Sequence, residues 1–280
     1  MDFRPLFDEI FDCRAPRPAR SLYYDLLAPW LNANPEHVAW LKEFRSRPGS
    51  PVPSATAEDL WDLYSISRVN ELLLAVLQEP PVVVSSDRWT DDEGTFRDRA
   101  ERWNLTLTQY CDFMRALGFA LREEPTFTPV LHEIVQVDQH TEARHPITLV
   151  GEFWPALMLG DMVFSRAGVL VEGGAARISK QIAECSALFW SWLRRYRPTR
   201  DLSMGWGSNS QWRTHFRRDY IVSDLAYLNV DPTGPYPGSD GLNEEQHREL
   251  LLHRCFIISH PVGSAVNFWP YDQTAVVSFP

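Results

Sequence analysis

The sequence predicts an α+β fold, in which a helical N-terminal region precedes a mixed, mainly antiparallel sheet with packed helices. Apolar residues recur at helical spacing through most of residues 1–125, short β-rich runs begin near Pro125, and helical patterns reappear between those runs. The 280 residues therefore divide into a mainly helical region, 1–125, and an α+β region, 126–280. At this length the two regions form either separate units or one integrated domain.

Helix-start signals define the elements of the N-terminal region. Asn34-Pro35-Glu36 combines a capping residue, a proline suited to the first helical position and an acid near the positive end of the helix dipole. Thr56 and Asp59 have the spacing of a capping box, and Pro80-Pro81 ends the helix that they begin. Asn104 is expected to cap a third helix.

The second region alternates strand and helix patterns. Its longest predicted helix is Ile178–Tyr196, where apolar residues alternate between spacings of three and four. Asn243 caps a short helix that has two acids in its first turn. Strands are predicted at 130–137, 147–153, 167–174, 220–222, 226–230, 255–259 and 275–279.

Charge and hydropathy limit the partners. The formal net charge is −10, and an acidic surface repels nucleic acid and anionic membranes, so a basic protein partner is the simpler expectation. No window approaches the roughly 18 consecutive apolar residues of a membrane span, and the N-terminus does not have the pattern of a signal peptide. We therefore expect a cytoplasmic protein without a membrane partner.

The most unusual segment is 201–220. Residues 194–218 hold seven arginines and one acid, Asp201, in a chain that is acidic overall. Guanidinium groups bind carboxylates and phosphates through paired hydrogen bonds, glycines let backbone amides approach an anion, and tryptophan stacks on planar groups. The candidate binding residues are Trp206, Asn209, Gln211, Trp212, Arg213, His215, Arg217 and Arg218.

An architectural interpretation of these arginines stays open beside the functional one. The arginines at 194–197 would then stabilise the end of the preceding helix through its dipole. Those at 213–218 would pair with acids from the first third of the chain, across a contact between the two regions. In that case the segment would hold the fold together and would recognise nothing.

Catalytic and metal-binding motifs are weak. The sequence holds no P-loop, dinucleotide fingerprint or hydrolase elbow. His132-Glu133, His140 and His145 lack the helical spacing of a zinc protease site and are expected at the surface, so neither a metal nor a cofactor is predicted. Glu152 lies beside Phe153-Trp154, and desolvation there is expected to raise its pKa.

The leading functional interpretation is an acidic cytosolic protein-binding module, of the type that immunity or toxin-neutralising proteins represent. The alternative is an enzyme that acts on an anionic small molecule or nucleotide through residues 203–220. In that alternative Arg213, Arg217 and Arg218 clamp the anion, His215 is the general acid or base, and Asn209 and Gln211 orient the substrate. A nucleic-acid contact through the same segment is less favoured because of the overall charge.

Overall fold

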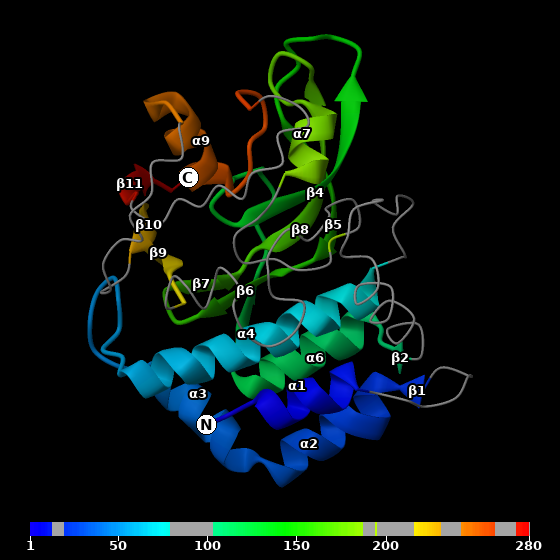
Figure 1. The fold of residues 1–280 in the computed structure, drawn as a ribbon, viewed down its shortest axis with the longest axis vertical. Coiled ribbons are helices and arrows are strands. Elements are labelled where there is room, and N and C mark those ends of the chain that lie inside the picture. The colour runs from blue at the N-terminus through cyan, green and yellow to red at the C-terminus, as the bar shows by residue number, and fades with distance from the viewer. Residues whose placement is uncertain are drawn as a thin grey trace.

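The computed structural model describes residues 1–12, 20–78, 103–186, 194, 216–230, 242–260 and 273–279, and it has the predicted α+β architecture. Helices of the N-terminal region gather at one end of the molecule, the two larger sheets occupy the middle, and α7 and α9 lie at the opposite end (Figure 1). The predicted order, helices first and sheet afterwards, is confirmed.

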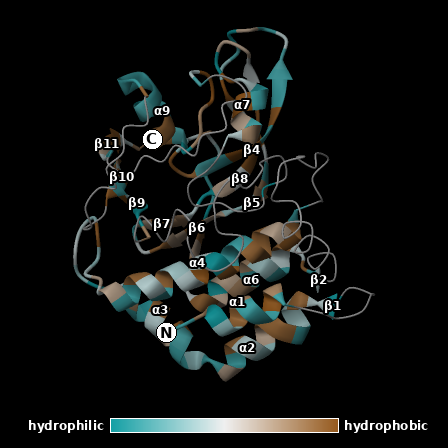
Figure 2. Ribbon diagram, in the orientation of Figure 1, coloured by the Kyte–Doolittle hydropathy of each residue, from teal (hydrophilic) through white to brown (hydrophobic). Residues whose placement is uncertain are grey.

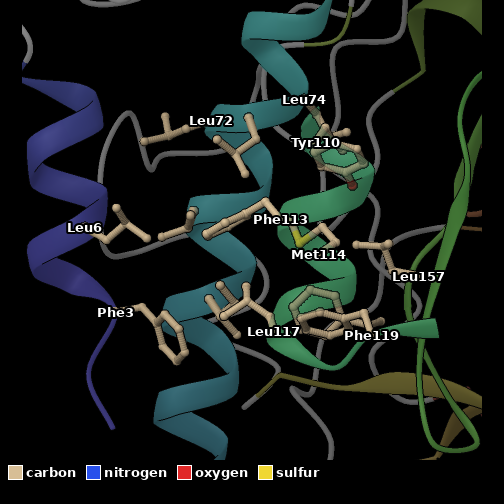
Figure 3. Packing of buried hydrophobic residues seen from close by; sticks show 14 of the residues in the cluster. Phe3, Leu6, Leu72, Leu74, Tyr110, Phe113, Met114, Leu117, Phe119 and Leu157 are labelled. Carbon is tan, nitrogen blue, oxygen red and sulfur yellow. The ribbon is translucent and has the colours of Figure 1, made fainter. Parts of the chain in front are cut away.

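The helical layer is built around one long central helix, α4. Figure 3 shows α4 between α1 and α6, with Leu6 of α1 facing it on one side and Phe113 of α6 on the other. Among the described residues, no helix is long and apolar enough to cross a membrane. The elements of this layer are α1 (Arg4–Phe11), η1, a π-helix (Tyr23–Leu27), α2 (Ala28–Ala33), α3 (Pro35–Phe44), α4 (Ala57–Leu77) and α6 (Leu107–Leu117).

The capping predictions are confirmed in part. Helix α3 starts at Pro35 as predicted, but the Asn34 side chain does not cap it and donates instead to the carbonyl of Trp30 at 2.8 Å. Thr56 and Asp59 make both hydrogen bonds of a capping box at the start of α4. The prediction for Asn104 is wrong, because Thr106 and Gln109 form the capping box of α6. Asn104 instead belongs to β2 (Trp103–Asn104), which pairs in parallel with β1 (Arg20–Ser21). The reciprocal Thr–Gln bonds satisfy two backbone donors, which a lone asparagine does not.

Two larger sheets follow the helices. The six-stranded sheet has the order β11-β10-β9-β7-β6-β3, and the neighbouring strands in it are antiparallel. In the three-stranded sheet, β8 lies between β4, its parallel partner, and β5, its antiparallel partner. The strands are β3 (Ala120–Arg122), β4 (His132–His140), β5 (Thr148–Trp154), β6 (Ala156–Leu159), β7 (Met162–Ser165), β8 (Ala167–Gly174), β9 (Arg218–Val222), β10 (Leu225–Val230) and β11 (Ala275–Ser278).

The predicted helix Ile178–Tyr196 is not one continuous helix. Helix α7 spans Lys180–Cys185, and Ser186 already has an extended backbone. The Ser186 hydroxyl donates to the carbonyl of Ile182 and to that of Phe256 at 3.3 Å, so a side chain competes with continuation of the helix. Residues 187–193 lie outside the described part of the chain.

The predicted strand 255–259 is also wrong. These residues follow α9 (Glu244–His253) in irregular structure. The carboxylate of Glu249 accepts the backbone amides of Ile257 at 2.6 Å, Ile258 at 2.7 Å and Ser259 at 3.2 Å. One side chain thus satisfies donors that a neighbouring strand would otherwise have to satisfy.

The hydrophobic core joins the helical layer to the six-stranded sheet. Its largest cluster combines residues of α1, α4 and α6 with residues of β6, β7 and β9. Figure 3 shows Leu157 of β6 facing Met114 of α6. A second cluster packs the three-stranded sheet against β9, β10 and α9. The ribbon of α9 is coloured mainly as hydrophilic (Figure 2), and its buried residues are Leu250 and Leu251.

Candidate functional site

Most of the predicted binding segment lies outside the described residues. Trp206, Asn209, Gln211, Trp212, Arg213 and His215 belong to that part, and for them the prediction stays a prediction.

Arg217 and Arg218 lie where the described chain resumes, at the start of β9. Their exposed fractions are 6% and 3%. The Arg218 guanidinium lies 3.6 Å from the ring centroid of Phe216 and donates to the carbonyl of Arg217 at 3.0 Å. Burial lowers the pKa of Arg218 to about 9. The negative charges of Glu71 and Asp219 raise this pKa, but they cancel only part of the effect of burial. Both side chains are therefore largely shielded from solvent.

Arg194 connects the helical layer to the three-stranded sheet. Its Nη1 donates to Glu71 Oε2 of α4 at 2.7 Å, and its Nε donates to Glu133 Oε1 of β4 at 2.6 Å. The guanidinium also lies 5.3 Å from the ring centroid of Trp154. Burial alone would lower the pKa of Arg194, but the charges and hydrogen bonds of Glu133 and Glu71 raise it. All three charged side chains are buried, so this is an internal ion-pair network.

A second internal network centres on Asp219 of β9. Its carboxylate accepts hydrogen bonds from Arg166 at 2.8 Å, from Arg254 and from the backbone amide of Asn229 at 2.7 Å. Arg166 lies between β7 and β8, and Arg254 ends α9, so the network ties the β7–β8 connection and α9 to β9. Burial raises the pKa of Asp219, but the two guanidinium charges lower it by more than burial raises it. The pKa of Asp219 is therefore below its usual value.

The buried charges cancel one another. The described residues include six buried carboxylates and six buried guanidinium groups. The formal net charge of −10 therefore comes from residues other than these buried acids and arginines. The buried acids are Asp59, Asp62, Glu71, Glu133, Glu184 and Asp219, and the buried arginines are Arg68, Arg166, Arg194, Arg217, Arg218 and Arg254.

Sequence reasoning did not identify Glu71, Arg166, Asp219 or Arg254 as members of such networks. One signal was present for Glu71, which lies inside the apolar run of a helix, between Asn70 and Leu72. A charged residue at such a position is almost never fully buried unless it is paired.

An acidic and aromatic surface lies on the N-terminal helices. We use the name α1–η1 face for the exposed residues Asp8, Glu9, Asp12, Tyr24 and Asp25, which lie on α1, at its C-terminal end and on η1. Two exposed arginines lie beside it, with Arg4 at 3.7 Å from Asp8 and Arg20 at 3.5 Å from Asp25. Tyr24 has an exposed fraction of 68%, the highest among the large hydrophobic side chains that the structure describes. Burial raises the pKa of Asp8, Arg4 opposes that change, and the charges of Asp12 and Asp2 add to it. Negative charges at the end of α1 thus repel one another.

Trp103 and Arg20 hold the two halves of the α1–η1 face together. The Trp103 indole donates to the carbonyl of Ile10, near the end of α1, at 3.1 Å. The Arg20 guanidinium lies 5.5 Å from the Trp103 ring centroid and 3.5 Å from the Asp25 carboxylate. The short π-helix that carries Tyr24 and Asp25 is therefore fixed relative to α1. Sequence reasoning missed this face, because a π-helix gives no periodic signal.

The prediction for Glu152 is confirmed. Burial raises the pKa of its carboxyl group, and the charge of Glu123 raises it further. The prediction for His132 is wrong, because this histidine is buried, with an exposed fraction of 2%. Its Nδ1 accepts the backbone amide of Thr128 at 3.0 Å, which requires the unprotonated nitrogen. Burial lowers the pKa of His132 to about 4.

The buried imidazole of His132 predicts acid sensitivity. Its folded pKa of about 4 lies below the ordinary unfolded value, so the unfolded chain takes up this proton first as the pH falls. Its stabilising effect is complete above about pH 6.5 and declines toward pH 4, by about 3 kcal/mol in total. In His132→Asn, whose amide oxygen can accept the Thr128 amide, the free energy of unfolding should fall less steeply in urea titrations across this range. Equal slopes in the parent and the variant, with His247→Asn as control, would contradict this account.

Comparison of the chain with known protein families, with curated proteins and with solved structures found no match. The fold and the distribution of charge described above are therefore the basis for a functional proposal.

Proposed function

We propose that the protein is an acidic cytosolic protein-binding module that captures a basic protein partner. Immunity and toxin-neutralising proteins are the type of module that we have in mind. The observation that carries the proposal is the separation of charge: the described buried acids and arginines are equal in number, which leaves the net −10 for the rest of the chain. An excess of one charge sign accelerates capture of an oppositely charged partner.

The α1–η1 face is the contact surface that we favour. Tyrosine is enriched among the residues that dominate binding energy, and Tyr24 is strongly exposed among carboxylates. The π-helix that presents it is a rare conformation that occurs often at functional sites. The basic surface of a partner would place its cations against Glu9 and Asp12 and would compete with Arg4 for Asp8 and with Arg20 for Asp25, while Tyr24 supplies apolar contact area.

The enzyme alternative draws no support from its two described residues. That alternative requires Arg217 and Arg218 to clamp an anionic substrate, but both side chains are buried, and Arg218 lies against Phe216. The other members of that site lie outside the described residues.

Capture by the full chain tests the proposal. Immobilised protein should retain a partner of positive net charge from native lysate at low salt. It should release this partner at about 0.5 M salt, because the attraction between exposed charges is then screened beyond a few ångströms. The combined variant Asp8→Asn, Glu9→Gln, Asp12→Asn should slow association with that purified partner about tenfold, as measured by surface plasmon resonance. Tyr24→Ala should instead accelerate dissociation.

The matched control removes three negative charges elsewhere, with Asp224→Asn, Glu244→Gln and Glu245→Gln, which are exposed on the β9–β10 turn and on α9. This control should associate with nearly the parent rate. The binding proposal is wrong if no salt-sensitive partner is captured. The assignment to the α1–η1 face is wrong if both triple variants slow association equally.

A further inference from the structure

The turn between β4 and β5 brings two histidines and a glutamate together. His140 ends β4, and His145 lies three residues before β5. One ligand atom from each of His140, Glu142 and His145 lies within 4.8 Å of the others. The two imidazole rings are stacked, with centroids 3.8 Å apart and planes 18° apart. The sequence predicted no metal here because helical spacing is lacking, but a tight turn produces the same proximity.

Backbone hydrogen bonds hold this turn in place. The amide of His145 donates to the carbonyl of Glu142 at 3.0 Å, and the carbonyl of His145 accepts the amide of Gly174 at 3.0 Å. The amide of Ala176 donates to the carbonyl of Ala143 at 2.7 Å. A Cβ atom on Gly174 would lie 2.3 Å from that Ala143 carbonyl oxygen, so the glycine permits the close approach. The three side chains therefore project from a backbone that is fixed against β8.

The surroundings of the cluster are negatively charged. A Glu172 carboxylate oxygen lies 3.8 Å from His145 Nε2. Asp138 pairs in register with Glu172 across β4 and β8, which places both side chains on the same face of the sheet as His140. Carboxylates around two imidazoles favour a bound cation over an anion.

We propose that His140, Glu142 and His145 form a binding site for a divalent transition metal of the zinc type. Imidazole and carboxylate are ligands that Zn²⁺ takes in proteins, and two histidines with one glutamate leave a fourth position for water. In a tetrahedral zinc site the ligating nitrogen and oxygen atoms lie about 3.3 Å from one another. The ligand atoms of the three residues lie within 4.8 Å of one another, so zinc binding requires them to move closer together by about 1.5 Å or less. Side-chain rotation supplies this movement, because the cluster is only half-buried or exposed.

The hydrogen bonds assign the ligating nitrogens. The Nδ1 of His140 accepts the amide of Glu142 at 3.0 Å, so its lone pair is free of a proton, and zinc would replace that exposed amide as its partner. In His145 the Nε2 faces Glu172, which leaves Nδ1 for the metal. Glu172 would then accept the Nε2 proton and orient the ring, as carboxylates beside zinc-bound histidines do.

Calorimetric titration of the full chain with ZnCl₂ at neutral pH tests the site. The parent should bind one zinc ion with a dissociation constant that the combined variant His140→Asn, His145→Asn raises at least a hundredfold. Co²⁺ in place of Zn²⁺ should give the visible absorption of a tetrahedral ion in the parent and none in that variant. Glu172→Gln should weaken zinc binding about tenfold to a hundredfold without abolishing it. Mg²⁺ should not compete, because it prefers oxygen ligands.

The control variant is His247→Asn, which removes a histidine from α9, away from the turn. It should bind zinc as the parent does. Equal zinc affinity in the parent and in the combined variant would overturn the proposal, as would an equal loss in the His247 control. Circular dichroism spectra and thermal unfolding without metal should agree among all variants, because the turn is held by backbone bonds. The zinc site does not depend on the proposed protein-binding function.

Discussion

Replacing Arg194 with methionine should lower the free energy of unfolding by about 3–5 kcal/mol. The substitution leaves Glu71 and Glu133 buried without the guanidinium that both of them contact. It also removes the cation that lies over the Trp154 ring. The loss of stability should appear in urea unfolding as a lower midpoint at an unchanged slope.

Two further variants separate charge from packing at this position. Arg194→Lys keeps the positive charge but contacts the two carboxylates through a single ammonium group, so it should lose less stability than Arg194→Met. Arg115→Met removes an exposed arginine and should change the free energy of unfolding by less than about 0.5 kcal/mol. A loss below about 1 kcal/mol in Arg194→Met would show that Arg194 is not part of a buried network.

Asp219→Asn should destabilise the protein by a similar amount, about 3–5 kcal/mol. The amide has the size of the carboxylate and can still accept the Asn229 backbone amide, so the variant tests the loss of charge. Two buried guanidinium groups, those of Arg166 and Arg254, would then lack their shared carboxylate. Urea unfolding at neutral pH measures this effect, with the exposed Asp224→Asn as control.

The stability of Asp219→Asn should also depend on pH differently from that of the parent. Because the folded pKa of Asp219 is lowered, its stabilising effect is present above the unfolded pKa of about 4 and is lost as the pH falls through the lower folded value. Asp219→Asn lacks this part of the pH dependence. The stability curves of parent and variant should therefore converge below pH 4, and parallel curves would contradict the assignment.

Local signals predicted several helices and strands, but strands β3, β6 and β7 of the six-stranded sheet were not predicted. The capping box at Thr56 and the cap at Asn243 depend on residues three positions apart, and both are present. Strand β8 has the predicted bounds, Ala167–Gly174, because β-branched residues lie between small residues and a Gly pair. At the two helix starts the determining contacts lie within three residues of one another.

Long-range contacts explain what could not be predicted. Arg194 and Glu71 are 123 positions apart, and no periodic pattern relates them. The three amide contacts of Glu249 replaced an expected strand, and their geometry depends on how α9 packs. The His140–His145 cluster depends on a turn that Gly174 of another strand permits. Predictions for Trp206 and its neighbours stay untested, because they fall outside the described residues.

A double-mutant cycle on Arg194 and Glu71 tests most directly whether the arginines described inside the protein are neutralised by its own carboxylates. Arg194→Met, Glu71→Gln and the combination of both are compared with the parent by urea unfolding. If the pair is internal, the combined variant should lose about 1.5–3 kcal/mol less than the sum of the single losses. Additive losses would mean that Arg194 does not pair with Glu71, and the separation of charge that supports the binding proposal would fail.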